Sequence, residues 1–253
     1  MEAIRFPGLV GVRGLSHGVT TRAGGASDGP FASLNLGRRT GDDPSRVAAN
    51  RRAVGVAFGG RDSPVFPRQV HGAHVALLAD PIVDDVGEAD GVATALVGTS
   101  VGVLGADCPG VLLVDPARRA LAVVHAGWRG AIGGAVEAAV STLGSQFSSK
   151  PSDLLAGIGP GISARRYEVG PEVADAFRSA FPDSTHVVTA GRGDRSFVDL
   201  RAAIRLRLLS CGLATSSIES IDACTYDEHD LFFSHRRDGE RTGRHALVAL
   251  WSE

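Results

Sequence analysis

Cysteine is scarce in this chain, whose 253 residues contain three: Cys108, Cys211 and Cys224. An odd number without framework spacing argues against a disulfide scaffold and indicates reduced thiols. Reduced thiols are typical of the cytoplasm, which is where we expect the protein to be. No Cys-x-x-Cys pair occurs, so the ligand spacing of a zinc finger is excluded.

A surplus of charge and a long apolar run are also missing. Lys and Arg number 26 and Asp and Glu 28, which gives a formal net charge of −2. We therefore expect no broad electrostatic binding of nucleic acid. No apolar stretch approaches the roughly 20 residues that a membrane-spanning helix needs, so we expect no membrane partner. The hydrophobic fraction of 43% and the charged fraction of 21% are those of an ordinary folded globule.

The chain does contain short apolar runs of strand length, interspersed with segments of helical periodicity. The apolar runs favour strands at 65–78 (interrupted at His71 and Gly72), 111–114, 120–124, 154–158, 218–225 and 245–251. The periodic segments favour helices at 43–57, at 132–143, from Pro171 onward and at 199–210. Because the sequence shows no repeat, linker or break in composition, we expect one mixed α/β domain spanning residues 1–253.

The stretch from Val101 to Gly130 combines a predicted hairpin with reactive side chains. The turn sequence at 115–119 lies between the apolar runs at 111–114 and 120–124. Cys108 comes just before the first strand, and His125 comes just after the second. An antiparallel pair brings such ends together, so we expect the thiol and the imidazole to meet at one rim of the sheet.

His71, in the interrupted strand, completes a candidate metal set with Cys108 and His125. Zinc takes thiolate and imidazole ligands, and catalytic zinc sites use three protein ligands with one position left open. The spacing alone leaves other interpretations open. Cys108 and His125 are also compatible with a nucleophilic dyad, with Asp107 or Asp90 orienting the imidazole. A structural zinc, or no site at all, is the remaining interpretation.

Several arginines are candidates for binding an anionic substrate, because a guanidinium matches phosphate oxygens in a two-pronged arrangement. They are Arg22, Arg51, Arg129 and the arginines of the polar loop at 236–244. A solvated surface position is the alternative interpretation for each of them.

Short motifs along nearly the whole chain resemble those of a known family. They are Thr21-Arg22-Ala23-Gly24-Gly25, Asn35-Leu36-Gly37, Asn50-Arg51, Gln69-Val70-His71-Gly72, Ala106-Asp107-Cys108, His125-Ala126-Gly127-Trp128-Arg129-Gly130, Gly159-Pro160, Tyr167-Glu168-Val169-Gly170, Arg236-Arg237-Asp238-Gly239 and Thr242-Gly243-Arg244. In this order they resemble the laccase-domain family, also called the multicopper polyphenol oxidase family, which includes unusual zinc-type purine nucleoside phosphorylases. The block from His125 to Gly130 is the most specific.

The resemblance implies a fold, a metal and an activity. The fold is a single-domain layered α/β/β/α sandwich with mixed sheets, resembling cysteine-hydrolase-like folds. Zinc is expected on His71, Cys108 and His125, with copper possible as an alternative occupant. The expected reactions are phosphorolysis of adenosine, inosine, guanosine and methylthioadenosine, and deamination of adenosine. Asn35, Arg51 and Arg129 are expected to face the nucleoside and phosphate.

Two other functions stay open at this stage. A copper-dependent polyphenol oxidase is disfavoured, because multicopper sites use many histidines with His-x-His pairs, and this chain has 8 histidines and no such pair. A Cys–His amide hydrolase in peptidoglycan editing is the other alternative. The sequence predicts neither the preferred purine nor the oligomeric state.

Overall fold

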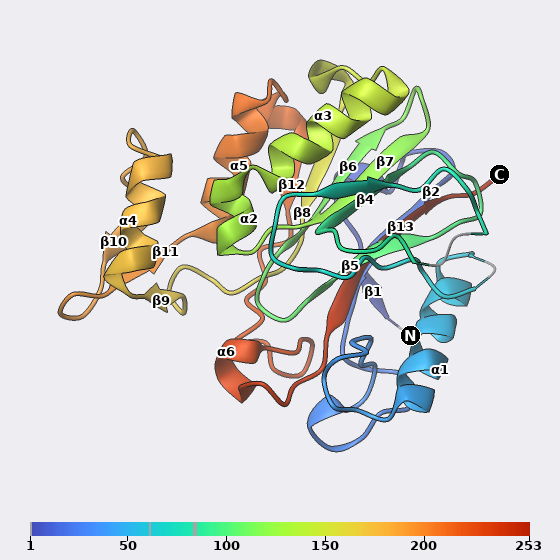
Figure 1. Cartoon of the computed structure of the whole chain (residues 1–253), viewed down its shortest axis with the longest axis horizontal. Helices are drawn as coiled ribbons and strands as arrows, with labels where there is room; N and C mark the ends of the chain where they lie inside the picture. Colours follow the sequence, from blue (N-terminus) through green and yellow to red (C-terminus); the bar gives the residue numbers. More distant parts are fainter. Residues whose placement is uncertain (1, 61, 83–84) are drawn as a thin grey trace.

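The computed structural model describes residues 2–60, 62–82 and 85–253, which form the helices and strands shown in Figure 1. One sheet has four strands, in the order β1 (Ala3–Ile4), β2 (Leu15–Thr20), β13 (His245–Trp251) and β5 (Val101–Gly105). A second has six, in the order β12 (Ile218–Ser220), β8 (Leu155–Ile158), β6 (Gly110–Asp115), β7 (Ala120–His125), β4 (Gly91–Thr94) and β3 (Val75–Leu77). The third is small, in the order β10 (Val188–Ala190), β11 (Ser196–Val198) and β9 (Glu168–Val169).

The described residues also form six α-helices. They are α1 (Pro44–Ala57), α2 (Trp128–Gly133), α3 (Ala135–Phe147), α4 (Pro171–Ala180), α5 (Leu200–Ser210) and α6 (His235–Asp238). Single 3₁₀ turns lie at Pro7–Leu9, Gly29–Phe31, Pro151–Asp153 and Thr215–Ser217. Within the described ranges, none of the helices has the length and apolar character that crossing a bilayer requires.

The layers follow from the alternation of side chains along the strands, which point to opposite faces in turn. In β6, Val111 and Leu113 pack with α3 and α5, whereas Leu112 and Val114 pack against the four-stranded sheet. In β13, the apolar side chains likewise divide between the inter-sheet core and the core under α1. Figure 1 shows α2, α3 and α5 on one side of the sheets and α1 on the other.

The predicted layered α/β/β/α sandwich is therefore confirmed, and the six-stranded sheet is mixed. Its β12–β8 and β3–β4 pairs are parallel, and the other pairs in it are antiparallel. The likeness to cysteine hydrolases and the extent of a single domain stay predictions.

The predicted hairpin is also confirmed, as β6 and β7. The pairing sets Gly110 opposite His125, which leaves Cys108 and His125 at the same rim. At the other end, the Asp115 carboxylate accepts hydrogen bonds from the backbone N–H groups of Ala117 and Arg118 and pairs with the Arg118 guanidinium. These contacts close the turn that the sequence predicted.

Three elements differ from the sequence-based expectation. The strand predicted at 218–225 is reduced to β12 at Ile218–Ser220. The helix predicted across 132–143 is broken at Gly134, whose φ of 87° ends α2 and begins α3. The strand predicted at 65–78 is reduced to β3 at Val75–Leu77. Upstream of β3, the Gln69 side chain bonds the backbone of Leu104, and His71 has a left-handed φ of 60°. Side-chain bonding and a turn therefore replace the regular strand ladder there.

Candidate metal centre and adjoining cavity

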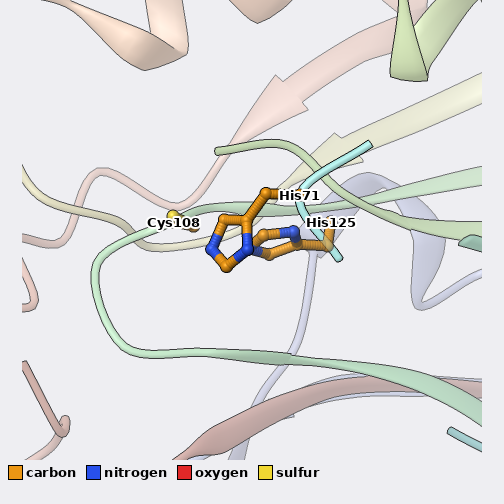
Figure 2. Close-up of side chains that lie close together, drawn as sticks. All are labelled: His71, Cys108 and His125. Atoms are coloured by element: carbon orange, nitrogen blue, oxygen red, sulfur yellow. The ribbon is translucent and has the colours of Figure 1, made fainter. Parts of the chain in front are cut away.

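His71, Cys108 and His125 come together from three segments. Cys108 lies between β5 and β6, His125 ends β7, and His71 lies in the turn before β3. One ligand atom from each residue lies within 4.8 Å of the other two. The two imidazole rings meet edge to face, with centroids 4.9 Å apart, and Figure 2 shows the Cys108 sulfur beside them.

The backbone around the cluster adopts uncommon conformations and comes close to the Cys108 sulfur. His71 and Asp107 both have positive φ values, 60° and 99°, which few non-glycine residues adopt. A Cβ atom on Gly127 would lie 2.8 Å from the Cys108 sulfur. The glycine after the His125 strand is therefore required by the position of the sulfur.

The charges of the cluster favour a thiolate beside an imidazolium. Burial raises the pKa of the Cys108 thiol, but the charges and hydrogen bonds of His125 and His71 outweigh it, so the pKa is lowered. Burial lowers the pKa of His125, but the Cys108 thiolate and the Asp90 carboxylate outweigh it and raise that pKa. Asp90 Oδ1 lies 3.1 Å from Nδ1 of His125. That contact occupies Nδ1, which leaves Nε2 as the ligand nitrogen.

The donor set fits a metal ion. A thiolate with two imidazoles is a combination that zinc and copper both accept. Within the described residues, no fourth His, Cys, Asp or Glu joins the group. His71 is exposed and Cys108 is half-buried, so the group opens toward solvent. Three ligands with an open side are the arrangement of a catalytic rather than a structural zinc site.

All three residues line a cavity of about 550 Å³. Its wall includes the apolar side chains of Phe66, Pro67 and Leu104. The wall is otherwise rich in cations, and the arginines among its described residues are Arg38, Arg39, Arg51, Arg68 and Arg244. The one acidic side chain among the described lining residues outside the cluster is Asp85. The cavity therefore favours an anionic ligand next to the metal set.

Arg51 is the most buried of these cations, with 7% of its surface exposed. Its Nε donates to the Leu36 carbonyl at 2.8 Å, and the guanidinium lies 4.7 Å from the centre of the Phe66 ring. In the described part of the chain no carboxylate pairs with it. Burial, and secondarily the charge of Arg38, lowers the pKa of Arg51 to about 10, so the group stays charged at neutral pH.

Arg244 is half-buried and bonds the carbonyls of Thr242 and Gly243 through one nitrogen. Burial lowers its pKa, whereas the charges of Cys108 and Asp107 act in the opposite direction. This guanidinium is therefore a second cation at the metal-set end of the cavity.

Asn35 lies behind the cavity wall and is fully buried. Its amide nitrogen donates to Thr40 Oγ1 and Asp42 Oδ2, and its oxygen accepts from the N–H groups of Gly37 and Arg244. Two donors and two acceptor sites are all that an amide side chain offers. Asn35 therefore has a structural role: its side chain connects the Gly37 turn to the backbone of Arg244 through hydrogen bonds.

Two arginines named from the sequence lie elsewhere. Arg129 is exposed, and its guanidinium lies 4.4 Å from the centre of the Trp128 ring, outside the lining of the cavity. Arg22 bonds the carbonyls of Ala32 and His229 and lies over the Phe233 ring. Both contacts are with protein groups.

Sequence reasoning missed several lining residues, among them Arg38, Arg68 and His235. Arg38 directly follows the Asn35-Leu36-Gly37 motif, and this proximity is the signal that could have identified it. His235 begins α6, which is tied to the cluster because the N–H of Arg236 donates to Asp107 at 2.6 Å. No local pattern in the sequence predicted that long-range contact.

Comparisons with known proteins agree with these observations. Residues 16–252 match the family model described as multi-copper polyphenol oxidoreductase laccase. Purine nucleoside phosphorylase YfiH of Shigella flexneri is 39% identical over 240 residues, covering 94% of each chain. Purine nucleoside phosphorylase Rv2149c of Mycobacterium tuberculosis is 40% identical over 250 residues, covering 97% of this chain and 95% of the relative.

A solved structure shows the same fold. The Bacillus licheniformis hypothetical protein YfiH aligns with a TM-score of 0.89 at 29% identity, covering 94% of this chain and 93% of that one. The sequence match and the fold match therefore extend over nearly the whole length. This chain belongs to the multi-copper polyphenol oxidoreductase laccase family.

Proposed function

We propose that this protein is a zinc-dependent purine nucleoside phosphorylase. One observation carries the proposal: the set of His71, Cys108 and His125 opens into a cavity whose wall holds Arg51, a buried cation with no carboxylate partner among the described residues. Relatives at 39% and 40% identity are named purine nucleoside phosphorylases. We assign adenosine, inosine, guanosine and methylthioadenosine as substrates, with phosphate as the second substrate.

In phosphorolysis, a phosphate oxygen bonds to C1′ of the ribose while the C1′–N9 bond breaks. The bonding electron pair leaves with the purine, which gains the proton that hydrogen phosphate gives up, and the sugar becomes ribose 1-phosphate, or 5-methylthioribose 1-phosphate from methylthioadenosine. Arg51 and Arg244 hold the phosphate, because two guanidinium groups offset its charge and orient an oxygen toward C1′. Phe66 and Leu104 supply the apolar part of the cavity wall.

His71, Cys108 and His125 hold the metal in this proposal. When bound, zinc supplies Lewis-acid stabilisation of developing negative charge and lowers the pKa of water at the site. Hydrolytic deamination of adenosine is therefore the second activity that we assign. Copper is an alternative occupant, since its affinity for such sites generally exceeds that of zinc. We place the enzyme in the cytoplasm, which suits three free thiols.

A Cys–His amide hydrolase is the second candidate. The observation that favours it is the order Asp90, His125 and Cys108, in which a carboxylate contacts the imidazole beside the thiol. It predicts rapid alkylation of Cys108 in metal-free protein, together with amide cleavage. A copper-dependent polyphenol oxidase is less favoured, because the described residues contain one three-ligand group.

Product analysis separates these functions. Protein of known zinc content is incubated with adenosine, with and without phosphate, and products are identified by chromatography and mass spectrometry. We expect adenine and ribose 1-phosphate when phosphate is present, and inosine in both conditions. Cys108→Ala and His125→Ala are expected to fold but to lose zinc and turnover. Intact adenosine in zinc-loaded wild-type protein contradicts the proposal.

A further inference from the structure

We propose that Asp90 is the positioning residue of the metal centre, and that its one carboxylate sets the metal affinity by holding His71 and His125 together. The inference rests on the proposed metal binding and is independent of the reaction. Asp90 lies immediately before β4 and is fully buried. It has contacts to the segments of both histidines.

The first contact fixes the turn that carries His71. The Asp90 carboxylate accepts the N–H groups of Val70 at 3.2 Å, His71 at 2.9 Å and Gly72 at 2.6 Å. Three consecutive N–H groups can converge on one carboxylate only in a tight turn, and His71 has its left-handed φ of 60° there. The backbone N–H of Asp90 also donates to the His74 carbonyl at 2.8 Å. The position of the His71 ring therefore depends on this carboxylate.

The second contact fixes His125. Asp90 Oδ1 lies 3.1 Å from Nδ1, and the Asp90 carbonyl accepts the N–H of His125 at 2.7 Å. A carboxylate is an acceptor, so the ring hydrogen is held on Nδ1. Nε2 then keeps its lone pair and points to the Cys108 side. Carboxylates that bond the far nitrogen of a histidine ligand orient the ring and increase its basicity.

Asp115 shows what a purely structural carboxylate looks like in this chain. It is also fully buried, at the far end of β6, and it also accepts backbone N–H groups in a turn. Its charge is paired with the Arg118 guanidinium, at 2.9 Å. Among the described residues, Asp90 has no such cation and its one ionisable partner is His125. A neutral hydrogen-bond acceptor would be sufficient to stabilise the turn. We therefore infer that the negative charge of Asp90 acts on His125.

The test is Asp90→Asn, with Asp115→Asn as the matched control. An asparagine keeps the shape, but its NH₂ cannot accept a hydrogen bond: in place of Oδ2 it would meet the N–H groups of Val70 and Gly72, and in place of Oδ1 the N–H of His71. The second orientation loses one acceptor instead of two. In that orientation the NH₂ donates to Nδ1 of His125 and moves the ring hydrogen to Nε2. We expect zinc affinity to fall by about 10- to 100-fold, measured by competition with a chromophoric chelator. Asp115→Asn is expected to lower the thermal midpoint while leaving the zinc dissociation constant unchanged.

The tautomer of the His125 ring distinguishes the proposed role of Asp90 from a purely structural role, which would leave that tautomer unchanged. Nitrogen NMR of the metal-free wild-type protein, recorded above the raised His125 pKa of about 9 so that the ring is neutral, is expected to show the ring hydrogen on Nδ1. In Asp90→Asn it is expected on Nε2. Wild-type zinc affinity in a folded Asp90→Asn protein overturns the proposal. If that variant does not fold, an Nε2–H tautomer of the neutral His125 ring in the metal-free wild-type protein overturns it.

Failure of the inference is distinguishable from failure of the proposed function. Zinc affinity and the tautomer are measured without nucleoside or phosphate. Tight zinc binding without phosphorolysis removes the proposed reaction and leaves the role of Asp90 standing. A wild-type protein that binds no zinc at these residues overturns both.

Discussion

Replacing Gly127 with alanine tests whether the geometry of the cluster is set by steric fit. Gly127 has φ −67° and ψ 178°, which alanine adopts without strain. The added Cβ would lie 2.8 Å from the Cys108 sulfur and 3.5 Å from a carbon of the His125 ring. Optimal separations between non-bonded heavy atoms are about 3.5–4.0 Å, so the sulfur must move by roughly 0.7 Å or more.

That displacement exceeds what a metal site tolerates, since ligand distances vary by about 0.2 Å around their ideal values. We therefore expect Gly127→Ala to bind zinc much more weakly and to lose turnover in proportion. Overpacking of this kind costs about 1–3 kcal/mol of folding free energy, so the variant remains folded.

Gly133→Ala is the matched control, at the end of the helix that Gly127 precedes. A Cβ atom at Gly133 meets nothing within 4 Å. Alanine is favoured over glycine in a helix by about 0.5–1 kcal/mol, so this control is expected to be as stable as wild type or more so. Zinc affinity is measured by chelator competition and stability by thermal unfolding. Wild-type zinc affinity in Gly127→Ala refutes the steric reasoning.

Two further predictions concern the phosphate and the dependence of stability on pH. Arg51→Gln is expected to raise the KM for phosphate by roughly 10- to 100-fold, because hydrogen bonds to charged groups contribute about 1.5–3 kcal/mol. Arg129→Ala, as the control, is expected to leave that KM unchanged. Equal effects of the two substitutions in initial-rate kinetics would contradict the assignment of Arg51. His17 accepts the Phe6 N–H at 3.1 Å, and burial lowers its pKa to about 4 from the unfolded value near 6.5. The unfolded chain takes up this proton first as pH falls, so stability is lost from pH 6.5 down to pH 4, by about 3 kcal/mol for His17 alone. His17→Gln is expected to flatten urea-unfolding free energies over that window, and an unchanged slope would exclude His17 as the cause.

The parts of the fold that the sequence predicted are those determined by local pattern. The continuous apolar runs of β6, β7 and β13 predict strands that are buried on both faces, in one mixed α/β domain. The layered sandwich itself was implied by the family resemblance. Asp43 and Pro44 begin α1 as predicted, with the Asp43 side chain accepting the Ser45 N–H. The turn at 115–119 brings Cys108 and His125 to one rim because hairpin pairing is local.

The parts that were not predictable depend on contacts distant in sequence. The interruption at His71 was visible in the sequence, but its cause, the Asp90 carboxylate, lies 19 residues away from His71. The helix break at Gly134 requires a left-handed residue, which the Gly133-Gly134 pair supplies, but the apolar spacing continued across it. Periodicity reports which face is buried and gives no information about a local change of helix axis.

The family motifs are a reliable guide to which positions are structurally or functionally important. They are a less reliable guide to the role of each residue. Arg51 and Arg129 both lie in such motifs, yet Arg51 lines the cavity and Arg129 lies over Trp128. Asn35 lies in a third motif, and its amide is fully used in holding Gly37 and Arg244 in place. A motif indicates that the residue type at a position is restricted. The restriction can come from contact with a ligand or from contacts that hold the cavity wall in place. Counting the free donors of each side chain separates these cases, and that count requires the folded chain.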